Sequence, residues 1–363
     1  MEKGKISALQ MAMLLYPAVV ATAILSVPSI TAAYAKQDLW LSPILAALPG
    51  FVSVYIAVGL SKLYPNQTVI QFTGQIIGQI PAKVLGFFIL AYYLQSTGEI
   101  TRAYGEFIVN SFLFETPLIV IIASMVFLCA FVVYGGIEVL GRIAQLFFPV
   151  FVIPLIVMVF LLSPYFEFGN IFPILEGGVV PPIKGAMMPS SWLTEVFLII
   201  FFLPFLADRE KGMKYSMITT FGVMITLVVV NLTVLFVLGI TTASKTYPLM
   251  NASRYISYAD FFENLDAVVM AVWIVGAFVK ISVFYYVVVL GTAQWLNLAD
   301  YRPIVWPIGI LIVQLSFWSV PNMMAFSRYE DTVLPFYANF YQVVLPLLLL
   351  VVGVVKKKKA SRF

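Results

Sequence analysis

Charged residues are spaced so unevenly along this chain that they divide it into long apolar runs. Seven runs contain no Asp, Glu, Lys or Arg, and they cover residues 6–35, 39–61, 116–137, 143–166, 215–244, 303–327 and 332–355. A helix needs about 20 predominantly apolar residues to cross a bilayer. The pattern therefore predicts a membrane-spanning helix in each of the seven runs.

Three more segments have the length to span a membrane but carry charge. Their bounds and charged residues are 84–110 with Glu99, Arg102 and Glu106, 187–207 with Glu195, and 267–299 with Lys280. A charge inside a membrane helix costs a few kcal/mol, so each charged span is a candidate functional site. We therefore expect an all-α integral membrane protein with ten transmembrane helices in one membrane domain, residues 1–363.

The distribution of lysine and arginine predicts the orientation of these helices. An even number of spans puts both termini on one side, and the side with more Lys and Arg in its loops is the cytoplasmic one. With the termini inside, fourteen basic residues fall in cytoplasmic segments and five in external loops. We therefore expect both termini in the cytoplasm, with residues 356–363 as a basic tail beside the anionic leaflet.

Composition excludes several kinds of chemistry. The chain is 62% hydrophobic and 10% charged, and it has no histidine and one cysteine. Disulfide frameworks, thiolate zinc sites and histidine acid–base catalysis are therefore not expected, and neither is an enzyme, a metal site or a cofactor. The net charge of +4 is too small to indicate a nucleic-acid partner.

The ten spans divide into two halves of five, residues 1–162 and 187–355. An odd number of spans in each half gives the halves opposite orientations, as in inverted-repeat transporters. The first helix of each half is predicted to be broken. Pro17 and Pro28 flank the small residues 21–23, and in the sixth helix hydroxyl residues surround Glu195. Paired broken helices indicate a binding site at the bilayer midplane.

Glu195 and Lys280 each stand alone among apolar residues near the middle of a span. Opposite charges on two helices are accommodated most easily if they face each other or a wet cavity. The alternative is a buried pair that only fixes helix register. Glu99, Arg102 and Glu106 follow one helical stripe at spacings of three and four, which is typical of a structural ion network.

Residues 21–28, Ala-Thr-Ala-Ile-Leu-Ser-Val-Pro, resemble the Gly-x-Gly-hydrophobic-Pro signature in the first helix of amino acid, polyamine and organocation transporters. The whole chain more closely resembles the B subunit of spore germinant receptors, in the endospore germination permease family. The motifs that carry this resemblance are Thr101-Arg102-Ala103, Thr116-Pro117, Leu203-Pro204, Tyr247-Pro248-Leu249, Phe262-Glu263 and Val272-Trp273-Ile274.

The resemblance implies a subunit of the inner spore membrane that binds a small germinant, often an amino acid. It would signal together with an A subunit and a lipoprotein C subunit. By position, the implied ligand-binding residues are Ala21, Thr22, Ala23, Tyr92, Ser96, Glu195, Val196, Lys280 and Phe284. This sequence departs from the family pattern at two alanines that replace glycines, and at two ionisable residues in the pocket.

A second function remains open, a proton-coupled amino acid symporter. In relatives of that superfamily that do not use sodium, a lysine ammonium occupies the sodium position, and Lys280 would do so here. Glu195 or Lys280 would then be the titrating group. The same pocket serves a sensor or a symporter, and the resemblance favours the sensor. A purely structural scaffold would leave both charges without a role.

The predicted orientation can be tested with epitope tags fused at Met1 and at Phe363. Both tags should resist protease added to sealed cells, because both termini are expected in the cytoplasm. A tag inserted in the predicted external loop at Gly177 serves as the cleaved control. Cleavage of the C-terminal tag would mean that one of the charged segments, in the first place 187–207, does not cross the membrane.

Overall fold

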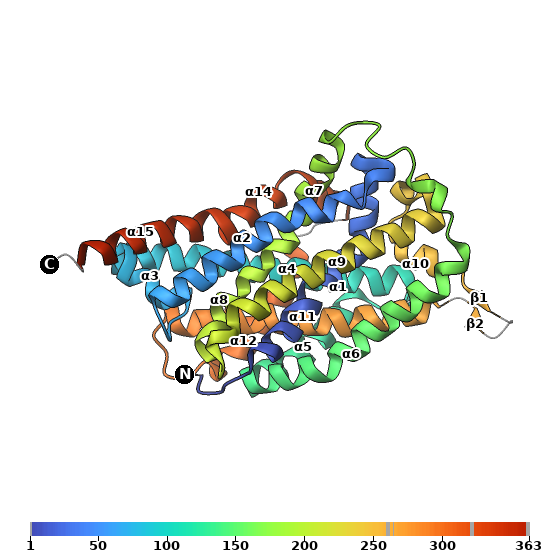
Figure 1. Cartoon of the computed structure of the whole chain (residues 1–363). Coiled ribbons are helices and arrows are strands. Elements are labelled where there is room, and N and C mark those ends of the chain that lie inside the picture. The colour runs from blue at the N-terminus through green and yellow to red at the C-terminus, as the bar shows by residue number, and fades with distance from the viewer. Residues whose placement is uncertain (1, 259–261, 264, 320–322, 361–363) are drawn as a thin grey trace.

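The computed structural model describes residues 2–258, 262–263, 265–319 and 323–360, and nearly all of them are helical. The long helices lie roughly along one axis, at differing tilts, and form an elongated bundle (Figure 1). One small hairpin, β1 (Ser257–Tyr258) and β2 (Phe262–Glu263), projects from one end of the bundle. Its two strands are antiparallel.

Eight helical segments of the described chain are long and apolar enough to cross a membrane. Their helices are α1 (Ala8–Ala35), α2 (Leu41–Leu63), α5 (Leu118–Gly135), α6 (Ile137–Leu162), α7 (Val180–Leu193) with its continuation, α9 (Gly212–Leu238), α11 (Asp266–Trp295), and α14 (Leu334–Asn339) with α15 (Leu345–Ala360). These eight agree with eight of the predicted spans.

Two further helices correspond to the remaining predicted spans. Helix α4 (Gln79–Ser111) has 33 residues and carries the charged stripe, and α12 (Val305–Trp318) has only 14 residues. Short helices connect the spans: α3 (Val69–Ile77), α10 (Pro248–Ser253) and α13 (Met323–Thr332). Of the apolar run 303–327, α12 covers the part up to Trp318, and α13 is a separate helix that begins at Met323.

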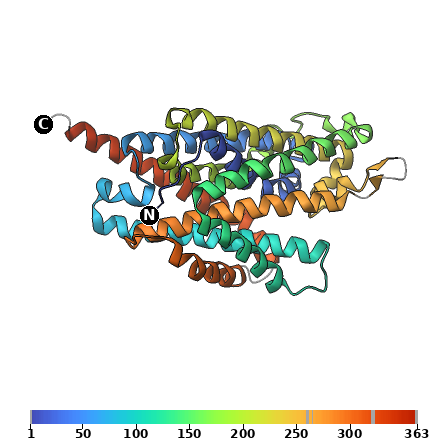
Figure 2. The same cartoon turned by 90° about the horizontal axis from the view of Figure 1, so that it is seen from below.

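Both chain ends lie toward the same end of the bundle, opposite the β1–β2 hairpin (Figures 1 and 2). This arrangement agrees with an even number of spans. Residues 1 and 361–363 themselves lie outside the described chain.

The interior of the bundle is built on close approach between helices. Helices in lipid gain little from hydrophobic burial against one another, so small residues that allow close packing matter most. A Cβ at Gly276 of α11 would lie 2.6 Å from the Cβ of Ala21 in α1 and 2.5 Å from the ring of Phe151 in α6. Only glycine fits there, and α1 and α11 can therefore lie against each other at the centre.

The predicted break in the first spanning helix is not found, because α1 is one continuous α-helix. Pro17 and Pro28 lie inside it. A proline removes one backbone donor and bends a helix, but the hydrogen bonds of the other residues remain. Residues 21–23 contain two alanines and no glycine, and alanine is the strongest helix former. These residues therefore stay helical.

The sixth spanning segment is interrupted, as predicted. Helix α7 is followed by a stretch of 3-10 helix, η4 (Thr194–Leu198), then by the single turn of α8 (Ile199–Phe202) and a second 3-10 turn, η5 (Leu203–Phe205). This segment begins at Val180, earlier than the expected residue 187. The change of helix type falls at Thr194, directly before Glu195.

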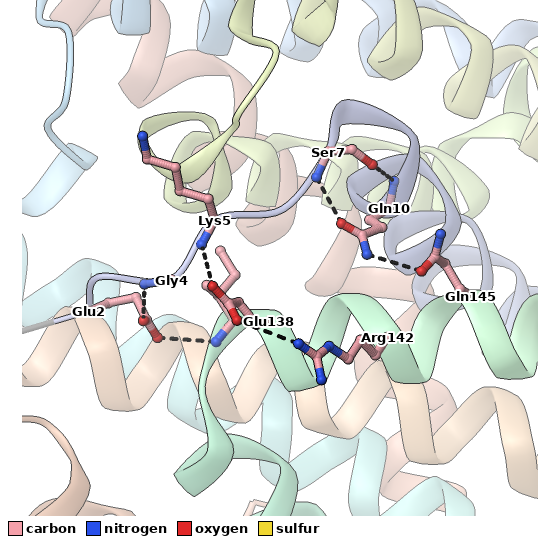
Figure 3. A network of polar contacts seen from close by, with 9 residues as sticks. Glu2, Gly4, Lys5, Ser7, Gln10, Glu138, Arg142 and Gln145 are labelled. Carbon is pink, nitrogen blue, oxygen red and sulfur yellow. Dashed lines mark hydrogen bonds and ion pairs between the residues drawn. The ribbon is translucent and has the colours of Figure 1, made fainter.

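Residues 2–7, which we call the N-terminal strap, lie at the end of the bundle that carries both termini (Figure 1), and Figure 3 shows their polar contacts with α6. Ile6 pairs with Leu206 as a parallel bridge, so the strap is bound to the end of the interrupted segment. Ser7 and Gln10 cap α1 reciprocally, and the Gln10 side chain donates to Gln145 of α6 (3.0 Å).

Glu2 fixes the other end of the strap. Its carboxylate accepts hydrogen bonds from the backbone of Gly4 (2.8 Å) and Ile137 (3.1 Å) and from the hydroxyls of Tyr286 and Tyr301 (both 3.1 Å). Burial alone would raise the pKa of Glu2, but these four hydrogen bonds together lower it below its ordinary value. Glu2 is therefore ionised at neutral pH, and the strap ties α1 to α6 and α11.

Candidate functional site

The break in the sixth segment follows from the hydroxyl residues around it. The Ser190 hydroxyl donates to the carbonyl of Met187 (2.6 Å), and the Thr194 hydroxyl donates to the carbonyl of Ser191 (3.0 Å). Such bonds compete with the backbone hydrogen bonds of an α-helix. The helix therefore changes type here, and Glu195 is the first charged residue beyond the change.

Lys280 of α11 meets Glu195 at this break. Its Nζ donates to Glu195 Oε2 (2.6 Å) and to the hydroxyl oxygen of Thr22 in α1 (2.9 Å). The Lys280 side chain has no exposed surface, and that of Glu195 is 9% exposed. The Phe284 ring centroid is 5.5 Å from Nζ, within the range of a cation–π contact. The structure thus confirms that the two isolated charges face each other.

Helix α2 packs against the interrupted segment at the break. The hydroxyl of Ser53 lies 2.9 Å from the carbonyl oxygen of Gln342 and 3.4 Å from that of Thr194. A Cβ at Gly50 would lie 2.8 Å from the carbonyl oxygen of Leu193, so a side chain there would press on the break. Close backbone contact and one hydroxyl therefore hold the interrupted segment in place.

A cavity of about 480 Å³ leads from the break to the end of the bundle that carries α10 and the hairpin. That volume is typical of small-molecule sites. At its inner end it is lined by Thr22, Tyr92, Ser96, Ser191 and Glu195, and at its outer end by residues that include Lys245, Tyr247 and Asp331. Ser244 and Asp331 are exposed to solvent, so the cavity opens at this end.

Four of the nine predicted site residues line this cavity: Thr22, Tyr92, Ser96 and Glu195. Lys280 lies directly behind Glu195 and reaches the cavity wall only through its two hydrogen bonds. The structure therefore brings five predicted residues to one place. Ligand contact by these residues stays a prediction.

The other four predicted residues, Ala21, Ala23, Val196 and Phe284, are at most 1% exposed and are not part of the cavity wall. Ala21 instead faces Gly276 and Phe151, as described above. Because α1 is a continuous helix, its backbone groups at Ala21 and Ala23 are not exposed to a ligand. A larger residue at 21 would disturb helix packing before it reached the cavity.

Tyr92 belongs to an aromatic cluster that the sequence did not predict. Its hydroxyl accepts a hydrogen bond from Gln342 (2.7 Å), and its ring stacks on Tyr341 with centroids 4.7 Å apart. Both partners lie in η9 (Phe340–Val344), a π-helical turn. Such turns are frequent at functional sites. The only sequence signal was an isolated glutamine in an apolar run.

The expected ion network on α4 is only partly present. Arg102 pairs with Glu106 (2.7 Å), as the spacing indicates. Glu99, however, accepts a hydrogen bond from Gln95 (2.8 Å) and lines the cavity. The first carboxylate of the stripe therefore lines the cavity, while the ion pair lies about one turn farther along α4.

Solved transporters show the same fold. The chain aligns with MhsT in complex with L-phenylalanine at a TM-score of 0.69 and 11% identity, over 96% of this chain and 89% of that one. It aligns with Mhp1, a nucleobase-cation-symport-1 family transporter with bromovinylhydantoin bound, at a TM-score of 0.66 and 11% identity, over 93% and 75%. The chain thus shares the fold of these transporters, and its apolar helices make it a multi-pass membrane protein.

A family profile described as "Spore germination protein" matches residues 5–324, and the chain belongs to that family. Spore germination protein KB of Bacillus subtilis (strain 168) is 27% identical over 370 residues, which cover 100% of this chain and 98% of the relative. Spore germination protein YndE of the same organism is 25% identical over 298 residues, 80% and 81% of the two chains. The resemblance seen in the sequence is thereby confirmed.

The Glu195–Lys280 pair predicts a non-additive mutational effect. Lys280→Met or Glu195→Gln leaves one buried charge without its partner, a cost of about 3–5 kcal/mol, whereas the double substitution removes both charges. Each single variant should therefore lower thermal stability and membrane abundance more than the double variant does. Thermal unfolding of the purified variants measures this coupling.

The exposed pair of Arg302 and Asp300 (3.8 Å) provides the control, because exposed pairs contribute about 0–1 kcal/mol. Arg302→Met and Asp300→Asn should have small effects that add. Additive effects of the Lys280 and Glu195 substitutions would contradict a stabilising contact between them.

Proposed function

We propose that this protein is the ligand-binding membrane subunit of a nutrient germinant receptor. A small germinant, an amino acid, binds in the cavity beside Thr22, Tyr92 and Glu195. Binding then signals germination through an A subunit and a lipoprotein C subunit. The protein resides in the inner membrane of the spore with both termini in the cytoplasm.

The cavity that ends on the interrupted sixth segment is the observation that carries this proposal. Its inner wall joins a carboxylate, three hydroxyls and the phenol of Tyr92, while its outer end is open. These groups suit the charged ends of a zwitterion. A ligand that prefers one arrangement of the break would shift the equilibrium between two conformations of the bundle, which a partner subunit can sense.

The relatives support the same reading. Matches named as spore germination proteins extend over the full chain and include spore germination protein A2 of Bacillus subtilis (strain 168), 23% identical over 333 residues. The A and C subunits come from the resemblance of the sequence to B subunits. They are partners that the proposal adds.

A second candidate is a proton-coupled amino acid symporter. Lys280 favours it, because this buried ammonium joins α1 to α11 through Thr22 and holds Glu195 at the same time. A cation at such a crossing can couple the movement of a solute to a proton. The folds of MhsT and Mhp1 fit this candidate equally well.

Ser26→Phe tests the receptor proposal. Ser26 lies on the cavity wall in α1 and is half-buried, so a phenyl ring there occupies the cavity and not the packed core. Spores with this variant should need at least about tenfold more amino acid to germinate, at normal abundance of the protein. The measurement is the dose dependence of the loss of optical density, over a panel of amino acids.

Leu48→Phe is the matched control, because Leu48 of α2 is 60% exposed on the outside of the bundle and should tolerate the change. Normal germinant potency in Ser26→Phe spores would contradict a ligand in this cavity. Proteoliposomes separate the two candidates. Accumulation of the amino acid under a proton gradient, abolished by Lys280→Met, would favour the symporter, and the receptor proposal expects no accumulation.

A further inference from the structure

The outer half of the cavity is lined by unequal numbers of opposite charges. Among its described lining residues, Glu99, Glu330 and Asp331 carry carboxylates, and Lys245 carries the one ammonium. Glu195 at the inner end is already neutralised by Lys280 behind it. The wall of the outer half therefore carries more acidic groups than basic ones.

Glu99 and Glu330 lack a basic partner within the described part of the chain. Glu99 is 6% exposed and accepts from the neutral amide of Gln95. Burial of Glu330 on α13, with Glu99 and Asp331 as the adjacent carboxylates, raises its pKa to about 8. A cation placed between two such carboxyl groups stabilises their ionised forms.

The same wall also carries hydrogen-bond donors without acceptors. The hydroxyl of Ser191 and the indole nitrogen of Trp273 have no hydrogen-bond partner among the described residues, and both side chains are 2% exposed. Both residues line the cavity. An unsatisfied buried donor costs about 1–3 kcal/mol, so a ligand with an acceptor group would relieve it.

We propose that the cavity selects an amino acid with a cationic side chain. The side-chain ammonium or guanidinium lies between the carboxylates of Glu99 and Glu330, and the ligand's own carboxylate accepts from Ser191. This inference rests on the proposed function and adds the charge class of the ligand. Three aromatic residues of the same cavity wall, Phe107, Tyr247 and Trp273, supply rings whose faces attract a cation.

Binding of L-lysine and of L-norleucine to the purified chain in lipid nanodiscs tests the proposal at constant salt. The two amino acids share a straight side chain of four carbons, and only lysine carries an ammonium at its end. Calorimetry should show lysine binding at least about tenfold more tightly. Glu99→Gln and Glu330→Gln should each reduce this preference and leave norleucine binding unchanged, whereas Ser191→Ala should weaken both ligands alike.

Glu176→Gln is the matched control, because Glu176 is exposed in the segment before α7 and does not line the cavity. It should retain the full preference for lysine. Thermal unfolding without ligand verifies that each variant is folded. Equal or tighter binding of norleucine, or a preference that survives in the Glu99→Gln, Glu330→Gln double variant, would overturn the proposal.

A third ligand, putrescine, separates this inference from the proposed function. Norleucine binding without any lysine preference would overturn the cation site alone and leave an amino acid receptor. Putrescine binding that depends on Glu99, without binding of either amino acid, would support the cation site and contradict the amino acid as germinant. Absence of binding by all three ligands would overturn both.

Discussion

The contact between Lys280 and Glu195 is the interaction on which the rest of the site depends. Each charge alone would be costly inside a membrane, and together they are tolerable only with good geometry and further hydrogen bonds. The 2.6 Å ion pair and the bond to Thr22 supply both. The pair thereby joins α1, the interrupted sixth segment and α11 at one point. A movement of the interrupted segment would therefore change the geometry of the ion pair. A ligand that changes this geometry would act on α1, the interrupted segment and α11 together.

The two ends of the bundle differ in a way that suits a sensor. At one end the cavity opens to solvent, with carboxylates and aromatic rings on its wall. At the other end the N-terminal strap bonds to η5, α6 and α11 through Ile6 and Glu2. The interrupted segment runs from the cavity to the strap. Movement at the break can therefore reach the end of the bundle that carries both chain termini.

Features that follow from isolated charges and from the length of apolar runs could be predicted from the sequence. Features that depend on the direction in which a side chain points could not. Isolated charges in apolar runs identified Glu195 and Lys280, and hydroxyl residues identified the sixth-segment break. The break in the first helix was predicted wrongly, because prolines beside small residues occur both in broken helices and in continuous, bent ones. Glu330 was missed because it lies between two apolar runs, on a short helix whose approach to α4 is a tertiary contact. The π-turn that brings Gln342 to the Tyr92 hydroxyl lies in an apolar run, where the glutamine itself is the one local signal.

Cysteine accessibility tests the central claim, that a continuous α1 presents one face to an open cavity ending at the Glu195–Lys280 pair. Cys129 is buried and can be replaced by alanine, so that Ser26→Cys and Ala23→Cys each carry one thiol. Both positions lie within about one turn of α1. In nanodiscs, which leave both membrane faces accessible, a hydrophilic thiol reagent should label the cysteine at 26 and not the one at 23. Labelling at 23 without labelling at 26 would contradict the account.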